Sequence, residues 1–151
     1  MPKYANNTQV SSDRSKQEIE KTLQRYGANG FMYGWQDNKA VVAFQMKNRH
    51  IKFILPMPDR NSNEFRLTDR GRARAESSIN QAYEQAIRQR WRALSLVIKA
   101  KLEAVESGIS EFESEFLANI VLPNGQTAGD YLIPQINQSY ENGSMPKLLT
   151  L

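Results

Sequence analysis

The feature that most constrains the fold is a helical spacing of apolar side chains sustained from Ala75 to Ser107, with Gly108 able to end the helix. At about 100° per residue these side chains fall on one arc, which needs a partner layer to cover it. One long amphipathic helix is therefore expected to form one side of the core. The arc holds Ile79, Tyr83, Ile87, Leu94, Val97, Ile98, Leu102 and Val105.

Three short segments before this helix have the alternation and composition of β-strands. They are residues 31–35, 40–46 and 50–55. Residues 36–39 offer a tight turn between the first two, because Asp and Asn tolerate a left-handed backbone. The prolines after the third segment end it, since proline cannot donate a hydrogen bond to a ladder. We expect an antiparallel meander with one buried face.

A first helix is expected before the strands, and its start is open between two places. Ser12 or Asp13 can cap a helix that runs to about Tyr26. Ser15 and Glu18 have the spacing of a capping box, so the helix can instead start at Ser15. The side chains expected to face the core are Ile19, Leu23 and Tyr26.

Shorter helices are expected after the long one, the first over residues 109–120. Thr127 can cap another, from Ala128 to about Tyr140, with an interruption or bend near Pro134. The tail, residues 145–151, is apolar enough to dock against the body.

Together these segments predict an α+β fold: an N-terminal helix, a three-stranded antiparallel meander, a long amphipathic helix and shorter C-terminal helices. Residues 1–12 are polar and are expected to be flexible. Residues 13–151 are expected to form a single domain, with a basic loop at residues 59–75.

The charge is divided unevenly along the chain. Residues 1–46 carry six Lys or Arg and four Asp or Glu, residues 47–101 carry thirteen and five, and residues 102–151 carry one and seven. A basic middle followed by an acidic end favours the binding of a polyanion to the middle region. The alternative interpretation is an ordinary solvated surface of mixed charge.

A nucleic acid is the polyanion that this pattern favours, because arginine prevails over lysine in the middle region and binds phosphate oxygens in a bidentate manner. Arg88, Arg92 and Lys99 share one side of the long helix, in a stripe roughly 16 Å long. The candidate nucleic-acid-binding residues are Arg49, Lys52, Arg60, Arg66, Arg70, Arg72, Arg74, Arg88, Arg92 and Lys99.

Aromatic side chains accompany these charges and have two interpretations. Phe31, Tyr33 and Trp35 point to one face of the first strand, where they can be a stacking platform for unpaired bases or the core face of the sheet. The core face is the commoner role. Trp91, between Arg90 and Arg92, is likewise expected to pack rather than to stack on a ligand.

No motif points to catalysis, so we expect neither an enzyme nor a cofactor. The chain has no cysteine and one histidine, His50, which leaves no credible zinc site. Glu111, Glu113 and Glu115 alternate on different faces of a helix and do not form a Mg²⁺ site. The start of the chain lacks the apolar stretch of a signal peptide, and no run of about 18 apolar residues occurs. We expect no membrane span and a cytoplasmic location.

Three stretches carry a resemblance to known proteins: EIEKTLQRYGANGFMYGW, HIKFILPMPD and QRWRALSLVIKAKLEAVESGISEFESEFLANIVLPNGQTAGDYLIPQI. They resemble a family of small proteins encoded by phages and prophages, which implies a phage origin and no particular activity. The order of elements is similar to the β-β-β-α core of phage single-strand annealing proteins of the Redβ type. That similarity implies a DNA strand held by residues 49–92 and assembly into a homo-oligomer.

The first functional hypothesis is a phage recombination or replication protein that binds single-stranded DNA. The alternative is an anti-defence or host-takeover protein, which sequesters a nucleotide signal or inhibits a host protein by direct binding. A third is a structural role through contacts between the basic and acidic regions of neighbouring copies.

Overall fold

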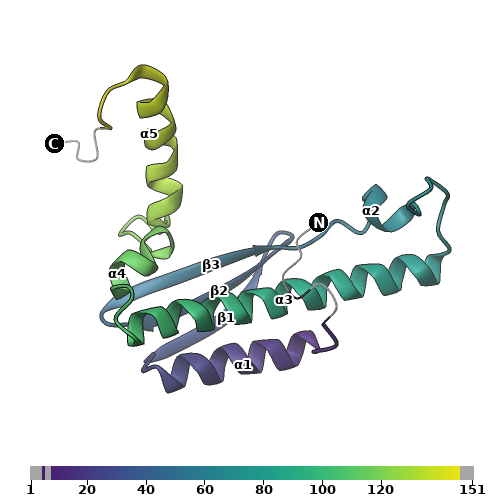
Figure 1. Cartoon of the computed structure of the whole chain (residues 1–151), viewed down its shortest axis with the longest axis horizontal. Helices are drawn as coiled ribbons and strands as arrows, with labels where there is room; N and C mark the ends of the chain where they lie inside the picture. Colours follow the sequence, from purple (N-terminus) through teal and green to yellow (C-terminus); the bar gives the residue numbers. More distant parts are fainter. Residues whose placement is uncertain (1–4, 6–7, 147–151) are drawn as a thin grey trace.

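The computed structural model describes residue 5 and residues 8–146, and it has the predicted α+β architecture (Figure 1). An N-terminal helix is followed by a three-stranded antiparallel sheet, a long helix and shorter C-terminal helices. The elements are α1 (Ser12–Arg25), β1 (Gly30–Gln36), β2 (Lys39–Met46), β3 (Arg49–Pro56), α2 (Asn63–Arg66), α3 (Glu76–Glu106), α4 (Phe112–Glu115), the 3-10 helix η1 (Leu117–Asn119) and α5 (Ala128–Asn142).

Helix α1 is capped by Ser11, not by any of the predicted residues. Ser11 has an extended backbone, and its hydroxyl oxygen accepts a hydrogen bond of 3.1 Å from the amide of Arg14. The predicted caps Ser12, Asp13 and Ser15 all lie inside the helix, so that prediction was wrong. Ser15 is fully buried on the packed side of the helix, which is not where a cap lies.

Two-residue turns join the strands into a sheet of order β1-β2-β3. Asp37 has a φ of 55° in the first turn, and Lys47 and Asn48 have φ values of 50° and 61° in the second. Asp and Asn adopt this left-handed backbone more readily than most residues. Because the second turn is this tight, β3 begins at Arg49, directly before the predicted start at His50.

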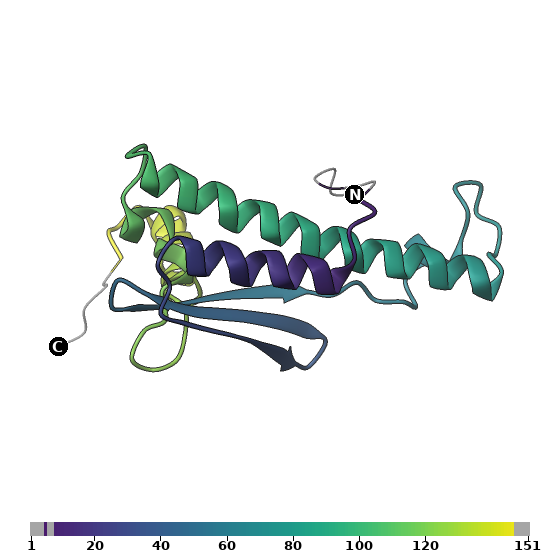
Figure 2. The same ribbon diagram turned by 90° about the horizontal axis from the view of Figure 1, so that it is seen from below.

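Helices α1 and α3 lie side by side on one face of the sheet (Figure 2). Strand β2 alternates strictly, so that Val42 and Phe44 are buried on the helix side. Leu23 of α1 enters the same core, as does Trp91 of α3, which is only 2 % exposed. This burial confirms the prediction that Trp91 packs in the core.

The buried side of α3 is wider than the predicted arc, because α1 packs against a second side of the helix. The buried residues common to prediction and structure are Ile79, Leu94, Ile98 and Leu102, and the other four expected positions are half-buried. The buried residues that the structure adds are Gln89, Trp91 and Ser95.

Residues 59–75 contain more structure than the expected loop. They include α2 and a bridge between Leu67 and Ala73. Phe65 is buried, and its ring centroid lies 5.7 Å from that of Tyr83 in an edge-on arrangement. This contact fixes the segment to the part of α3 that extends beyond the sheet (Figure 1).

The helix expected over residues 109–120 is wrong, because two short turns, α4 and η1, take its place. Ile120 instead pairs with Ile51 of β3, and the amide of Val121 donates a hydrogen bond of 2.8 Å to the carbonyl oxygen of His50. A helix cannot continue where its backbone must pair with a strand, so the segment breaks. This pairing also covers part of the outer edge of β3.

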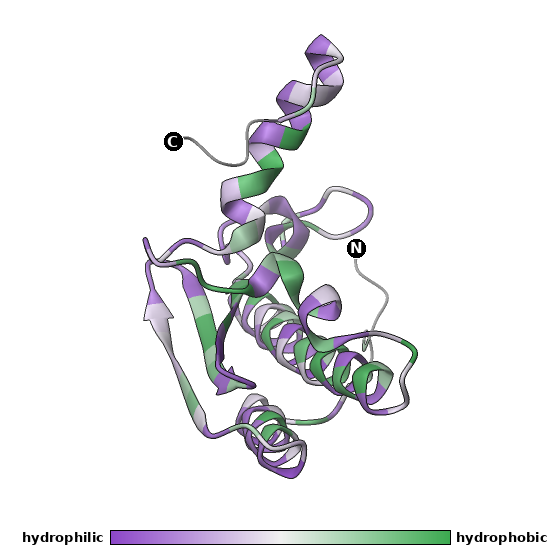
Figure 3. Ribbon diagram, turned by 90° about the vertical axis from the view of Figure 1, so that its left-hand side faces the viewer, coloured by the Kyte–Doolittle hydropathy of each residue, from purple (hydrophilic) through white to green (hydrophobic). Residues whose placement is uncertain are grey.

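Helix α5 begins as predicted after Thr127, whose hydroxyl oxygen accepts a hydrogen bond of 3.1 Å from the amide of Asp130. The helix continues through Pro134 without interruption and ends at Gly143, which has a φ of 70°. Its only buried residues are in the first turn, and the rest of the helix stands away from the body (Figures 1 and 3).

Three further expectations concern the ends of the chain and the membrane. The carbonyl oxygen of Thr8 accepts a hydrogen bond of 2.8 Å from the side chain of Gln85, so the chain touches α3 before α1 begins. At the other end, Met145 is exposed, and residues 147–151 of the expected docking tail lie outside the described residues. Within the described ranges, no helix is both long and apolar enough to cross a membrane.

Candidate nucleic-acid interface

Helices α1 and α3 run in the same direction, so corresponding turns of the two helices are neighbours (Figure 2). The start of α1 lies beside Arg88, and its last turns lie beside Lys99. Cationic side chains line both sides of the groove between the helices. We call them the basic seam: Arg14, Lys21 and Arg25 from α1, and Arg88, Arg92 and Lys99 from α3.

The helical period brings these cations to one side of each helix. Residues that are four, seven or eleven positions apart share a helix face, and both helices place their seam residues at these spacings. From Arg88 to Lys99 the seam is roughly 16 Å long at 1.5 Å per residue. Because α1 is parallel to α3, its own cations follow the same line.

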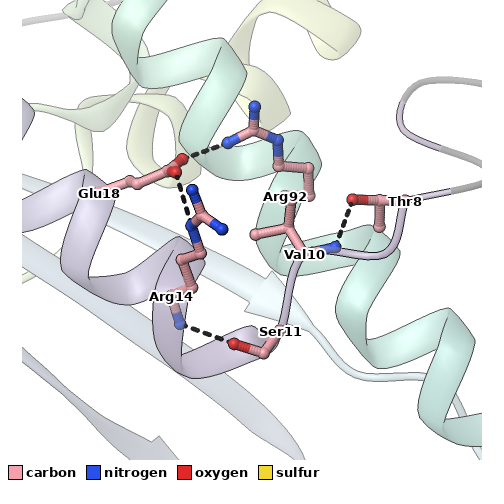
Figure 4. A network of polar contacts seen from close by, with 6 residues as sticks. All are labelled: Thr8, Val10, Ser11, Arg14, Glu18 and Arg92. Carbon is pink, nitrogen blue, oxygen red and sulfur yellow. Dashed lines mark hydrogen bonds and ion pairs between the residues drawn. The ribbon is translucent and has the colours of Figure 1, made fainter.

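The carboxylate of Glu18 lies in the middle of the seam. Glu18 accepts a hydrogen bond from the guanidinium of Arg92, and its other oxygen lies 3.6 Å from Nε of Arg14 (Figure 4). Two guanidinium groups therefore share one negative charge, which leaves the group positive. The side chains of Arg92 and Glu18 are 26 % and 34 % exposed, so the contact holds Arg92 in the groove between the helices.

Three of the other four cations of the seam are more available. Lys21, Arg25 and Lys99 are exposed, and none forms an ion pair with a carboxylate among the described residues. They line a hollow of about 400 Å³ together with the Glu18–Arg92 pair, Thr22 and Ser95. Cations and hydroxyl groups are the side chains that commonly bind phosphate oxygens.

The seam is less positive at the start of α1. There Arg88 is half-buried, and its Nη2 atom donates a hydrogen bond of 2.6 Å to the side chain of Gln85. Glu84 lines the same small hollow, together with Ser11. The free positive charge is therefore concentrated between Lys21 and Lys99.

Three of the other predicted binding residues are engaged with the protein itself. Arg49 forms an ion pair with Glu113 at 3.4 Å, and Lys52 donates a hydrogen bond of 3.4 Å to the carbonyl oxygen of Gly125. Arg60 forms an ion pair with a glutamate at the start of α3, and its Nε donates a hydrogen bond of 3.1 Å to the side chain of an asparagine one turn further on. None of the three lies in the seam.

The remaining four predicted residues form a separate cationic group at the end of the molecule. We call it the arginine tip: Arg66, Arg70, Arg72 and Arg74. None of them pairs with a described carboxylate. The tip lies beside the first turns of α3, whereas the seam begins at Arg88 further along the helix. Of the ten predicted residues, only Arg88, Arg92 and Lys99 thus belong to the seam.

The contribution of α1 to the seam was not predicted from the sequence. Its three seam cations lie in a segment with only a small excess of positive charge, because the acidic residues of the same segment, among them Glu18 of the seam itself, balance most of the total. The available signal was the spacing of Arg14, Lys21 and Arg25, which places them on one face of the expected first helix.

The aromatic strand faces the core but is only partly covered. Phe31, Tyr33 and Trp35 pair across from the buried side chains of β2, so they point to the helix side of the sheet. Phe31 packs against the core, whereas Tyr33 is 50 % and Trp35 64 % exposed at the edge of the sheet. The ammonium group of Lys16 lies 5.3 Å from the ring centroid of Tyr33.

Acidic and histidine side chains do not converge on a site. In the part of the chain that the structure describes, no group of three or more His, Cys, Asp or Glu residues could hold a metal ion. Glu113 pairs with Arg49, and Glu115 lies 3.8 Å from the ammonium group of Lys101. These glutamates therefore serve as partners of cations at the end of the sheet.

Comparisons with family models, with curated proteins and with solved structures found no match for this chain.

Proposed function

We propose that the protein binds single-stranded nucleic acid, with DNA favoured, by holding its phosphates in the basic seam. The observation that carries the proposal is the convergence of six cations from two helices on one groove, of which four have no ion-pair partner among the described residues. Cations spaced along a line can neutralise successive phosphates of one strand. The similarity of element order to phage single-strand annealing proteins suggests recombination or replication as the setting.

A single strand suits this groove better than a duplex. Helices that pack side by side have axes about 8–10 Å apart, so the groove between them accommodates one sugar-phosphate backbone. A strand held there keeps its bases on the outside, where they remain free to pair with another strand. That arrangement is compatible with an accessory role in annealing.

The test is a titration of a labelled oligothymidylate at several salt concentrations, followed by fluorescence anisotropy. If three to five phosphates are neutralised, the slope of log K against log salt concentration is about −2 to −3.5. An unlabelled duplex of equal length should compete poorly. A flat salt response would contradict the proposal, and so would equal competition by the duplex.

Two single charge reversals distinguish binding in the seam from binding by positive charge anywhere on the surface. Lys99→Glu lies in the seam, whereas Lys39→Glu is a matched control at the exposed start of β2. We expect Lys99→Glu to weaken binding about tenfold, through the loss of one phosphate contact and the added repulsion, and Lys39→Glu to change it little. Arg70→Glu combined with Arg72→Glu tests the arginine tip in the same assay. A larger loss of affinity in this double variant than in Lys99→Glu would show that the binding site is the arginine tip and not the seam.

A second candidate function is the sequestration of a nucleotide. The hollow of about 400 Å³ between the helices favours it, because four cations, one carboxylate and two hydroxyl-bearing side chains line a space of small-molecule size. Isothermal titration calorimetry with a panel of nucleotides would then give one site per chain and a weak dependence on salt. Binding of the oligonucleotide with a steep salt slope, and no binding of nucleotides, would exclude it.

A further inference from the structure

Strand β1 has a free edge, unlike the other outer strand of the sheet. Among the described residues, β1 pairs only with β2. The outer edge of β3, by contrast, is partly covered, because Ile120 pairs with Ile51 and the side chain of Asn119 donates a hydrogen bond of 3.1 Å to the carbonyl oxygen of Lys52. Alternate residues of the seven in β1 therefore present a row of backbone donors and acceptors to solvent.

The composition of β1 does not protect this edge. Exposed edge strands usually carry charges, proline or a bulge, which prevent pairing with another chain. The sequence of β1, GFMYGWQ, has no charge and no proline, and its seven residues pair with β2 in an unbroken register. Strand β3, on the other side, carries Arg49, His50, Lys52 and Pro56.

The exposed side chains of β1 are large and apolar. Met32 and Trp35 are each 64 % exposed, and Tyr33 is 50 % exposed. They lie on both faces of the strand, because successive side chains alternate. The helices of the same copy leave these side chains exposed, whereas a strand paired with the free edge of β1 would cover them.

We propose that β1 pairs with β1 of a second copy of this chain, in antiparallel orientation about a two-fold axis. A strand without charge can pair with itself, since no like charges are brought together. Full overlap of the seven residues places Tyr33 on the axis, opposite the partner's Tyr33. The result is a continuous six-stranded sheet.

Side-chain sizes are complementary in this register. Met32 faces the partner's Gly34, and a Cβ added at Gly34 would meet nothing within 4 Å, so there is room for the methionine. Phe31 faces the partner's Trp35 on the other side of the sheet, and aromatic pairs across strands are favourable. A two-fold axis perpendicular to the sheet keeps the helices of both copies on the same face. This pairing does not depend on the proposed nucleic-acid binding.

Cysteine cross-linking tests the register directly, because the chain has no cysteine of its own. Residues that are opposite each other in antiparallel strands have Cα atoms about 4.5–5.5 Å apart, which suits a disulfide. Tyr33→Cys should therefore give a disulfide-linked dimer under mild oxidation. Trp35→Cys is the matched control, since two copies of residue 35 would lie about 13 Å apart. Equal cross-linking of both variants, or none of Tyr33→Cys, would overturn the proposal.

The mass in solution provides an independent measurement by sedimentation equilibrium. We expect a dimer for the unaltered chain and a shift to monomer for Met32→Lys, which places a charge at the interface. Ile54→Lys is the control, because Ile54 is exposed on the same face of the sheet as Met32 but belongs to β3. Ile136→Lys tests α5 as a competing interface. A monomeric unaltered chain would contradict the proposal, as would a dimer that only Ile136→Lys dissociates.

Discussion

The guanidinium of Arg92 on α3 donates a hydrogen bond to the carboxylate of Glu18 on α1. This contact joins the two helices at the middle of the basic seam, and it places a negative charge between the cations there. Glu18 thus fixes one phosphate-binding candidate in position while lowering the positive potential of the groove.

Replacing that carboxylate should strengthen nucleic-acid binding. Glu18→Gln keeps the size of the side chain and removes its charge, so we expect about fivefold tighter binding of the oligothymidylate, from the loss of roughly 1 kcal/mol of repulsion. The free energy of unfolding should change by less than about 1 kcal/mol, because partly exposed ion pairs contribute little. Anisotropy and urea unfolding measure the two effects. Glu20→Gln, on the exposed side of α1, is the control. Weaker binding by Glu18→Gln would contradict the proposal that the seam binds nucleic acid.

The hydroxyl of Ser15 is a buried polar group without a hydrogen-bond partner in the described structure. A buried hydroxyl without a partner costs about 1–3 kcal/mol relative to its hydration in water. We therefore expect Ser15→Ala to leave the urea midpoint unchanged or to raise it. A clear fall in the midpoint would show that the hydroxyl has a favourable contact.

The cap of α1 can be identified by two neighbouring substitutions. Ser11→Ala removes the hydrogen bond to the amide of Arg14 and should lower the free energy of unfolding by about 1 kcal/mol. Ser12→Ala should have almost no effect, because Ser12 is already inside the helix. Urea unfolding of the two variants decides between the caps, and the reverse order would restore the cap expected from the sequence.

Gly129 allows α5 to approach η1 closely. A Cβ added there would lie 2.9 Å from the carbonyl oxygen of Ala118, which is backbone and cannot move aside cheaply. We expect Gly129→Ala to lower the free energy of unfolding by about 1–3 kcal/mol. Gly30→Ala is the control, since its nearest neighbour would be at an ordinary 3.6 Å. An equal effect of the two variants in urea unfolding would refute the close approach.

Most of the fold could be predicted from the sequence, because its signals are local. Alternation in 40–46 and helical spacing in 75–107 each identify an element without knowledge of its neighbours. The segment 109–120 could not be predicted in this way. It has the residue spacing of a helix, but it does not form one helix because Ile120 pairs with Ile51, a contact between distant parts of the chain.

The candidate site could be predicted less well, since charge totals along the chain do not say which side chains share a face. The basic middle region contains Arg49, Arg60 and Arg92, yet each of them has a carboxylate partner in the fold. The nearly balanced first helix contributes half of the seam. Only the packing of α1 on α3 brings these two sets of cations together.

The way in which α5 rests on the body has a consequence for its own stability. Only Ala128 and Gly129 of this helix are buried, so its later turns gain almost nothing from tertiary packing. A helix of 15 residues is marginal in water when it stands alone. The backbone amides of its last turns should consequently exchange with deuterium far sooner than those of α3, although both helices belong to one chain.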